Sequence, residues 1–190
     1  MTADRVTAER RAAQKHQRAC IIWLTGLSGA GKSTIANALE AALVEREKHT
    51  YLLDGDQLRD SLNADLGFDL PSRDENVRRV AQVAKQFVEA GLIALVALIS
   101  PLRRQRDFAR SLVTAHEFVE VHLSTPLAEC ERRDPKGLYK RARAGLIKEF
   151  TGIDSPYEAP QSAEITIDTT GTTSDECVAK ILSYLAAGRY

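Results

Sequence analysis

Apolar residues recur along the chain in two alternating patterns. "CIIWLT" at 20–25 is a short apolar run rich in β-forming residues, whereas "STIANALEAALVERE" at 33–47 spaces its apolar residues three and four apart. The first pattern predicts a strand and the second predicts an amphipathic helix. A glycine-rich turn from Gly26 joins them, so the chain begins with the order strand, loop, helix.

Four more strands are predicted, and helices are predicted between them. The strands are "TYLLDGD" at 50–56, "LIALVALIS" at 92–100, "FVEVHLS" at 118–124 and "EITIDTT" at 164–170. The run at 92–100 is apolar throughout, which is typical of a central parallel strand covered on both faces, and Pro101 ends it.

The longest predicted helix spans 73–90. A capping box of Ser72 and Glu75 is expected to start it, and Gly91 to end it. Further helices are expected at 103–113, after Pro126 and at the end of the chain. Strands alternating with helices predict an α/β fold with a doubly wound parallel sheet and right-handed crossovers.

Length and composition predict one domain. The chain has 190 residues, of which 44% are hydrophobic, enough for one well-buried core. Residues 1–19 lack the apolar segment of a signal peptide, and Asp4 and Glu9 argue against a transit peptide. We expect 1–19 to be an exposed, partly helical arm, and 20–190 to be the domain.

Charge and cysteine content narrow the partners and the compartment. Lys plus Arg and Asp plus Glu both number 26, so no overall field favours nucleic acid or a membrane surface. The longest apolar run is too short to span a bilayer. Cys20, Cys130 and Cys177 are widely spaced and odd in number, which predicts free thiols and a cytoplasmic setting.

The turn after the first strand carries the chemistry of a phosphate site. Residues 26–33, "GLSGAGKS", match G-x-x-x-x-G-K-[ST] between a strand and a helix. Its backbone N–H groups and the following helix N-terminus favour phosphate oxygens. Lys32 would bridge the β- and γ-phosphates and the Ser33 hydroxyl would bind Mg²⁺, which predicts an ATP site.

Carboxylates and a hydroxyl follow two other strands. Asp54 is interpreted as a functional carboxylate, which would hold Mg²⁺ through water or accept a proton from an acceptor hydroxyl. Asp56 could share that role or cap the next helix. Ser100, which follows the central strand, could contact substrate, accept phosphate, or simply end the strand before Pro101.

Basic and aromatic residues are candidates for the acceptor site. Arg73 and Asn76 share one helical face near its start, with Arg59 on the preceding segment, and could bind an anion or lie in solvent. Phe68 and Phe150 could stack on a base or belong to the core. The basic segment 130–150 could close over polyphosphate as a lid, or form a solvated helix.

Several segments together resemble the adenylylsulfate kinase family of P-loop kinases. They are "WLTGLSGAGKSTIA", "LLDGDQLRDSLNADLGF", "RDENVRRVAQVAK", "ALISPLRRQRDFAR", "CERRDPKGLYKRARAG" and "KEFTGIDSPYEAP". They follow the family's order over residues 20–186. The resemblance implies a three-layer P-loop kinase fold with a five-stranded parallel sheet and a helical lid.

The resemblance also implies the reaction: ATP and Mg²⁺ would phosphorylate the 3′-hydroxyl of adenosine 5′-phosphosulfate. Phe68 and Phe150 would sandwich its adenine, Asp54 would lie near the acceptor hydroxyl and the metal, and the lid would centre on Lys136 and Leu138. The ATP-binding positions it implies are Gly26, Leu27, Ser28, Gly29, Ala30, Gly31, Lys32, Ser33, Thr34 and Arg132. The substrate-binding positions are Asp56, Arg59, Phe68, Arg73, Asn76, Ile99, Ser100, Lys136, Leu138 and Phe150.

Family descriptions mark the position of Ser100 as a phosphoserine intermediate. Direct in-line transfer needs mainly positioning and charge neutralisation, so we expect Ser100 to lie in the active site without carrying the phosphate. Leu102 and Leu146 depart from a tyrosine and a glutamate that are usual in the family, and neither touches the assigned machinery. The family suggests a homodimer and a functional link to ATP sulfurylase, of which the chain contains no domain.

Two other functions remain possible from the sequence. Another small-molecule or nucleoside kinase would use the same phosphate loop with a different acceptor. A nucleotide-dependent switch would also use it, but the guanine-specifying N-K-x-D segment is missing.

Overall fold

A parallel five-stranded sheet organises the computed structural model, which describes residues 6–188. The strands are β1 (Cys20–Gly26), β2 (Thr50–Asp54), β3 (Ile93–Ala97), β4 (Phe118–Leu123) and β5 (Ile165–Ile167). They lie in the order β2-β3-β1-β4-β5, and every neighbouring pair is parallel. The predicted α/β class and the five-stranded parallel sheet are confirmed.

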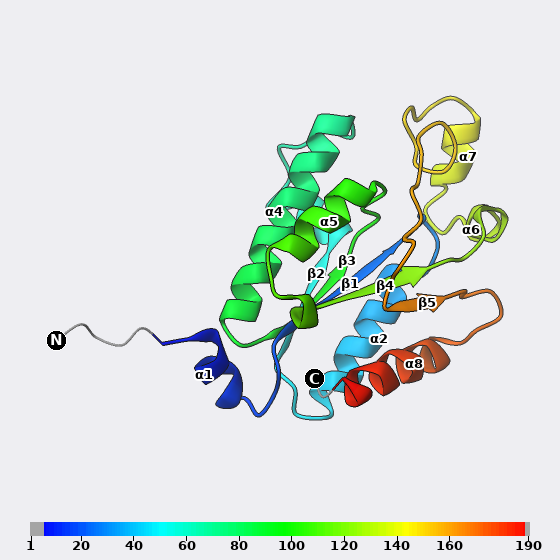
Figure 1. The fold of residues 1–190 in the computed structure, drawn as a ribbon. Coiled ribbons are helices and arrows are strands. Elements are labelled where there is room, and N and C mark those ends of the chain that lie inside the picture. Colours follow the sequence, from blue (N-terminus) through cyan, green and yellow to red (C-terminus); the bar gives the residue numbers. More distant parts are fainter. Residues whose placement is uncertain (1–5, 189–190) are drawn as a thin grey trace.

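Helices cover both faces of this sheet, giving three layers (Figure 1). One face carries α2 (Lys32–Val44) and α8 (Ser174–Ala187), and the other carries α4 (Leu70–Glu89) and α5 (Arg103–Ser111). The short helices are α1 (Ala8–Ala13), α3 (Gly55–Arg59), α6 (Leu127–Arg133) and α7 (Leu138–Arg143), with a 3-10 turn at Ala115–Glu117. No helix among residues 6–188 is both long and apolar enough to cross a membrane.

Strand β1 supplies side chains to two separate cores. Ile22 and Leu24 pack with α2 and α8, whereas Ile21 and Trp23 pack with α4. All four are fully buried. Alternate side chains of a strand point to opposite faces, so a run that is apolar throughout is what a sheet covered on both sides requires.

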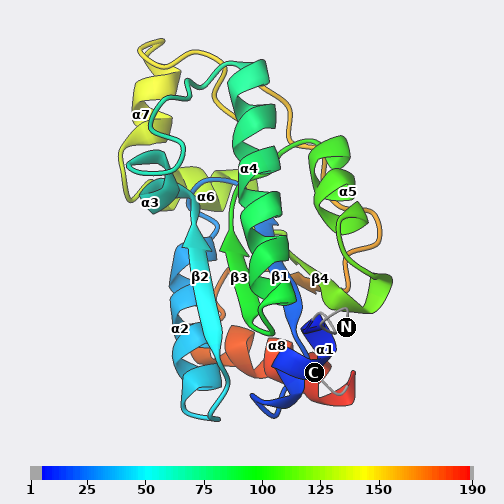
Figure 2. The same cartoon turned by 90° about the vertical axis from the view of Figure 1, so that its left-hand side faces the viewer.

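Parallel pairing gathers the loops that follow the strands. The register aligns Leu24 with Ala97 and Gly26 with Leu123, so β1, β3 and β4 end together. Figure 2 shows α3, α7 and the start of α4 at the end of the sheet toward which β2 runs. Ligands of open α/β sheets bind at this carboxyl edge.

The start of the long helix differs from the prediction. Helix α4 begins at Leu70, and its N-cap is Asp69, whose carboxylate accepts the Ser72 N–H at 3.0 Å. The predicted Ser72–Glu75 capping box is therefore wrong. Glu75 instead pairs with Arg78 and Arg79 on the helix surface. Asp is as good an N-cap as Ser, so the cap could form one turn earlier.

Part of the N-terminal arm packs on the domain, unlike the exposed arm that the sequence suggested. Helix α1 lies against α4 at the end of the sheet opposite α6 and α7 (Figure 1). Buried Gln17 donates to the carbonyls of Gly91, at 2.8 Å, and His49, at 3.0 Å, and accepts the His49 N–H at 2.8 Å. One side chain thus joins the arm to the start of β2 and to the end of α4.

We predict that Gln17→Ala lowers the free energy of unfolding by about 2 kcal/mol, because three hydrogen bonds are lost and the His49 and Gly91 groups lose their partner. Urea denaturation would measure the change. Gln14→Ala, an exposed position of the same arm, is the matched control and should change the free energy little. Equal effects of the two substitutions would contradict the anchoring role.

Candidate active site

The carboxyl edge of the sheet opens into one large cavity of about 1250 Å³. Five segments line it: the phosphate loop with the start of α2, the segment from the end of β2 to the first turns of α4, the loop after β3, the segment from α6 to Thr151, and the segment from Thr169 to Cys177. Most of the predicted site residues are in its lining: Ser28, Gly29, Gly31, Lys32, Ser33, Thr34, Asp54, Asp56, Arg59, Phe68, Arg73, Asn76, Ile99, Ser100, Lys136, Leu138 and Phe150. Residues distant in sequence therefore form one site.

The phosphate loop requires glycine where it passes closest to its neighbours. A Cβ on Gly26 would lie 2.7 Å from the Leu123 carbonyl oxygen, and one on Gly29 would lie 2.9 Å from the Cys130 carbonyl oxygen. Gly29 has φ +77° and Gly31 has φ +94°, which side chains rarely adopt. The loop therefore holds its backbone close to β4 and α6.

Lys32 lies half-buried under the loop that precedes it. Its Nζ donates to the carbonyls of Gly26 at 3.0 Å and Leu27 at 2.8 Å. Burial lowers the pKa of its ammonium group to about 8. The carbonyl dipoles thus hold the Lys32 ammonium group at the loop. An anion that approaches it would stabilise the protonated form of this side chain.

Asp54 and Asp56 have different surroundings. The buried Asp54 carboxylate accepts the Asp56 N–H at 2.9 Å and is the N-cap of α3, so capping belongs to Asp54 and not to Asp56. The exposed Asp56 carboxylate pairs with Lys136 of the 134–137 loop between α6 and α7. This ion pair joins the loop after β2 to the basic segment.

Arg73 connects the two segments of the cavity lining that carry Phe68 and Phe150. Its Nε donates to the Phe68 carbonyl at 2.6 Å, its Nη1 donates to Thr151 Oγ1 at 2.6 Å, and its Nη2 donates to the Glu149 carbonyl. Burial lowers the pKa of this guanidinium group. Phe68 and Phe150 thus face the same cavity from segments that one arginine ties together.

The two rings differ in exposure. Phe68 is 68% exposed and has the Arg59 guanidinium 4.6 Å from its ring centroid, whereas Phe150 is 9% exposed and packs against Tyr139. Phe150 is part of the core cluster, which confirms the core interpretation made from the sequence, and it also lines the cavity. Phe68 lacks such packing and presents an apolar ring to the cavity.

Asn76 presents donors to the cavity because a neighbour occupies its acceptor. Buried Asn63 donates from Nδ2 to Asn76 Oδ1 at 3.0 Å. The two N–H groups of the Asn76 amide can then donate hydrogen bonds to another partner, and an anion is a suitable acceptor for them. Asn63 was not singled out from the sequence, because its segment showed no periodic pattern.

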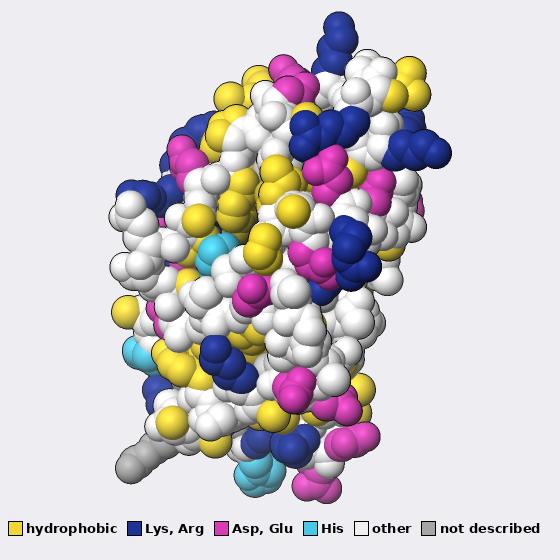
Figure 3. Space-filling view, turned by 90° about the vertical axis from the view of Figure 1, so that its right-hand side faces the viewer, with side chains coloured by type: hydrophobic (Ala, Val, Ile, Leu, Met, Phe, Trp, Pro, Cys, Tyr) yellow, Lys and Arg dark blue, Asp and Glu magenta, His cyan; other side chains and the backbone are white. Residues whose placement is uncertain are grey.

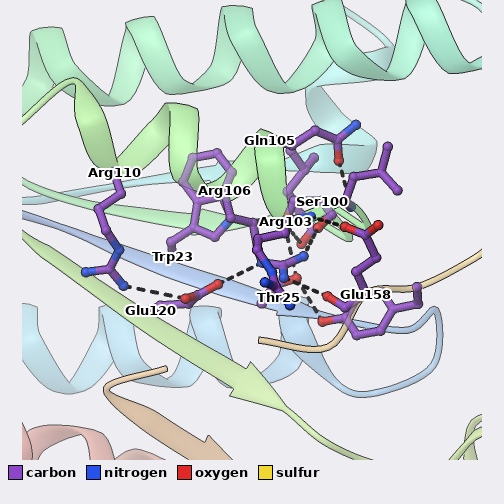
Figure 4. Close-up of polar contacts among 12 residues, drawn as sticks. Trp23, Thr25, Ser100, Arg103, Gln105, Arg106, Arg110, Glu120 and Glu158 are labelled. Atoms are coloured by element: carbon purple, nitrogen blue, oxygen red, sulfur yellow. Dashed lines mark hydrogen bonds and ion pairs between the residues drawn. The ribbon is translucent and has the colours of Figure 1, made fainter. Parts of the chain in front are cut away.

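Ser100 is enclosed in a buried polar network, shown in Figure 4. Its Oγ accepts from Trp23 Nε1 at 3.0 Å and donates to Thr25 Oγ1 at 3.1 Å, and the residue is 1% exposed. Its backbone φ is +40°, a strained value for a residue with a side chain. Arg106 holds the Ser100 carbonyl at 2.8 Å and pairs with Glu120.

Arg106 was not recognised from the sequence as a residue that shapes the site. It is 3% exposed, and it also donates to the Glu158 carbonyl at 2.6 Å. It therefore joins the turn after β3 to the end of the 150–158 segment, whose other end carries Phe150. A charge run on an amphipathic helix gives no sign of such an inward-facing arginine.

The basic segment is largely paired with acidic residues. Arg132 and Arg133 both contact Glu129, and Arg143 contacts Glu131. On the face that carries α6 and α7, Lys and Arg side chains alternate with acidic ones over the upper half (Figure 3). Of the charged side chains in this basic segment, those of Arg133, Lys136, Arg141 and Lys148 line the cavity.

Arg132 does not reach the cavity. Its side chain is 72% exposed and points to Glu129, whereas Arg133 donates to Thr169 Oγ1 at 2.8 Å and lies 3.4 Å from the Gly29 carbonyl. Successive residues of a helix point in directions about 100° apart, so only one of the pair can face the loop. Arg133 is therefore the better candidate for contact with a nucleotide.

Comparison with known proteins identifies the family. The model of the family described as adenylylsulphate kinase matches residues 18–168. The chain belongs to the adenylylsulfate kinase family. An adenylyl-sulfate kinase of Shewanella amazonensis is 59% identical to this family member, over 97% of this chain and 93% of the relative.

Two solved structures of adenylylsulfate (APS) kinases are also similar to this family member. The Mycobacterium tuberculosis APS kinase in complex with AMPPNP and APS has a TM-score of 0.85 and 46% identity, over 90% of this chain and 99% of that one. The hexameric APS kinase from Thiobacillus denitrificans has a TM-score of 0.72 and 36% identity, over 93% of this chain and 30% of that one.

The low pKa of Lys32 predicts proton uptake when a polyphosphate binds. At about pH 8.5 much of the amine is neutral in the free protein, and an adjacent anion raises its pKa and protonates it. Titration calorimetry with ADP in buffers of different ionisation enthalpy should show this uptake, and it should nearly vanish at about pH 7, where Lys32 already carries its proton. Heats that do not depend on the buffer at the higher pH would contradict the assignment.

Proposed function

We propose that this protein is an adenylyl-sulfate kinase, which transfers the γ-phosphate of ATP to the 3′-hydroxyl of adenosine 5′-phosphosulfate. The observation that carries the proposal is the single cavity in which a phosphate loop faces two phenylalanines and a set of basic and amide donors. A donor site and a site for an anionic, base-containing acceptor thus share one space. Family membership supports the same activity.

The donor half is assigned to the phosphate loop. Residues 26–34 would surround the ATP phosphates with N–H groups, and Lys32 and Arg133 would neutralise their charge. Thr169, Thr172 and Ser174 line the cavity on the same side, since Thr169 Oγ1 contacts the Ala30 carbonyl at 3.2 Å. This side is where we place the nucleoside of ATP.

The acceptor half is assigned to the other side of the cavity. Phe68 and Phe150 would hold the adenine between them, because flat apolar rings stack well on a base. Arg59, Arg73, Asn76 and Lys136 would hold the phosphosulfate, and Ile99 and Leu138 would provide apolar walls beside them. This arrangement would leave the acceptor ribose between the base and the phosphate loop.

A magnesium ion fits the oxygen groups at the junction of the two halves. The Ser33 hydroxyl and the Asp54 carboxylate both line the cavity, and Mg²⁺ commonly takes one or two protein oxygens beside substrate phosphates and water. When bound, it would neutralise charge on the transferred group. Asp54 has one oxygen fixed by the Asp56 N–H, so its second oxygen would hold Mg²⁺ through a water molecule and would stay free of direct metal contact to accept a proton.

The chain's own residues would carry out transfer by positioning. The acceptor 3′-oxygen forms a bond to the γ-phosphorus while the bond to the β,γ-bridging oxygen breaks, giving ADP and 3′-phosphoadenosine 5′-phosphosulfate. The hydroxyl proton passes to the Asp54 carboxylate. Lys32 stays protonated beside the phosphates, and the basic lid excludes water, which would otherwise compete as the acceptor.

We further propose a homodimer that works in the cytoplasm and uses the product of an ATP sulfurylase. An APS kinase with 36% identity assembles as a hexamer, which supports self-association in the family. All three cysteines are buried free thiols, as suits a reducing compartment. The link to a sulfurylase follows from chemistry, because adenylyl transfer to sulfate is the reaction that must supply this acceptor.

The activity test uses purified protein with ATP and Mg²⁺, offering adenosine 5′-phosphosulfate, nucleosides or water as acceptors. We expect ADP release to require adenosine 5′-phosphosulfate and to match formation of the 3′-phosphorylated product. Release that is equally fast with a nucleoside would favour the alternative kinase. Release without any acceptor would favour a nucleotide-dependent switch.

Ser100→Ala should retain measurable turnover, because transfer is direct and the Ser100 hydroxyl is engaged by Trp23 and Thr25. We expect a loss of about tenfold or less, since one buried hydrogen-bond partner of Trp23 and Thr25 is removed. Rapid-quench assays with γ-labelled ATP measure turnover and any labelled protein. Complete loss in the variant, together with labelled phosphoserine in the parent, would overturn direct transfer.

A further inference from the structure

Three side chains from outside the phosphate loop hold its carbonyl groups. Tyr139 OH donates to the Ser28 carbonyl at 3.0 Å, Arg133 Nη1 lies 3.4 Å from the Gly29 carbonyl, and Thr169 Oγ1 donates to the Ala30 carbonyl at 3.2 Å. The conformation of the phosphate loop therefore depends on these side-chain contacts as well as on its glycines. Of these three partners, Tyr139 is the most deeply buried, at 1% exposed.

Holding a carbonyl also aims the next N–H group. A trans peptide is planar and places its C=O and N–H on opposite sides. The Ser28 carbonyl points to Tyr139, so the Gly29 N–H points the other way. Gly29 lines the cavity. The Tyr139 hydroxyl thus fixes the direction of a peptide in the part of the loop that faces phosphate.

The ring of Tyr139 contacts the opposite half of the site. It packs edge-on against Phe150, with ring centroids 5.0 Å apart and an interplanar angle of 79°. Phe150 is one of the two rings assigned to the acceptor base. An edge-to-face pair fixes the orientation of both rings, so Tyr139 determines how Phe150 faces the cavity.

Tyr139 itself belongs to the basic lid. It lies in α7, one residue after Leu138, and its backbone N–H donates to the Asp134 carboxylate at 3.1 Å. The side chain therefore extends from the lid into the core between the phosphate loop and Phe150. Burial raises the pKa of its hydroxyl, so the group remains a hydrogen-bond donor at neutral pH.

We propose that Tyr139 is a positioning residue with two separable tasks: its hydroxyl orients the phosphate loop for the donor, and its ring orients Phe150 for the acceptor. The acceptor task rests on the proposed function. The donor task rests on the phosphate loop alone. Neither task requires Tyr139 to touch a substrate.

Two substitutions separate the tasks. Tyr139→Phe removes the hydroxyl and keeps the ring. KM for ATP and Kd for ADP should therefore rise about tenfold, as expected for one lost buried hydrogen bond. KM for adenosine 5′-phosphosulfate should change less than about twofold. Tyr139→Leu removes both features, so both KM values should rise. The phenylalanine variant should thus rescue the acceptor KM relative to leucine.

Controls separate positioning from simple loss of stability. Tyr51→Phe is the matched control, because Tyr51 lies on β2, is 50% exposed and packs only against Phe87 in the described aromatic contacts. It should leave both KM values unchanged. Thermal unfolding checks each variant; if Tyr139→Leu does not fold, Tyr139→Met replaces it, because it also lacks the ring and the hydroxyl, and it should raise both KM values.

Some outcomes would overturn the proposal. Tyr139→Phe with an unchanged Kd for ADP would remove the donor task, and equal changes of both KM values in this variant would reduce Tyr139 to a structural residue. An acceptor KM that is the same in Tyr139→Phe and Tyr139→Leu would remove the acceptor task. A parent protein without turnover of adenosine 5′-phosphosulfate would refute the proposed function, yet ADP binding would still test the donor task.

Discussion

The parallel register of β1 with β3 and β4 is the constraint on which the site depends. It brings Gly26 so close to the Leu123 carbonyl that no side chain fits there, and it places Ser100 beside Thr25. The phosphate loop and the turn after β3 therefore start from fixed points of one rigid sheet. Positioning of this kind is what in-line phosphoryl transfer requires most.

Around this rigid edge, the site is assembled by arginines and a tyrosine that face inward. Arg73 ties the Phe68 loop to the 149–151 segment, and Arg106 ties the turn after β3 to Glu158. Tyr139 connects the lid to the loop that would hold ATP. Each of these side chains donates hydrogen bonds to backbone carbonyls of segments that are distant in the sequence. The contacts that connect these segments in the fold are therefore also the contacts that shape the site.

The charges of the lid divide into two groups with different tasks. Arg132 and Arg143 form exposed pairs within the lid, which contribute little to stability. Arg133, Arg141 and Lys148 line the cavity, and Lys136 contacts Asp56 across it. The phosphosulfate that we assign to Lys136 would compete with Asp56 for its ammonium group, so this ion pair would exchange when the acceptor binds.

The amino-acid sequence by itself determined the class of fold and the phosphate loop, and with the family resemblance it predicted seventeen of the residues that line the cavity. Strands such as 92–100 are apolar on both faces, and the loop has strict glycine spacing, so local patterns are sufficient to predict them. Only the tertiary structure decided that Asp69 caps α4, that Arg133 and not Arg132 faces the phosphate loop, and that Tyr139 joins Ser28 to Phe150. These depend on contacts between residues far apart in the chain, and spacing along a sequence carries no information about such distances.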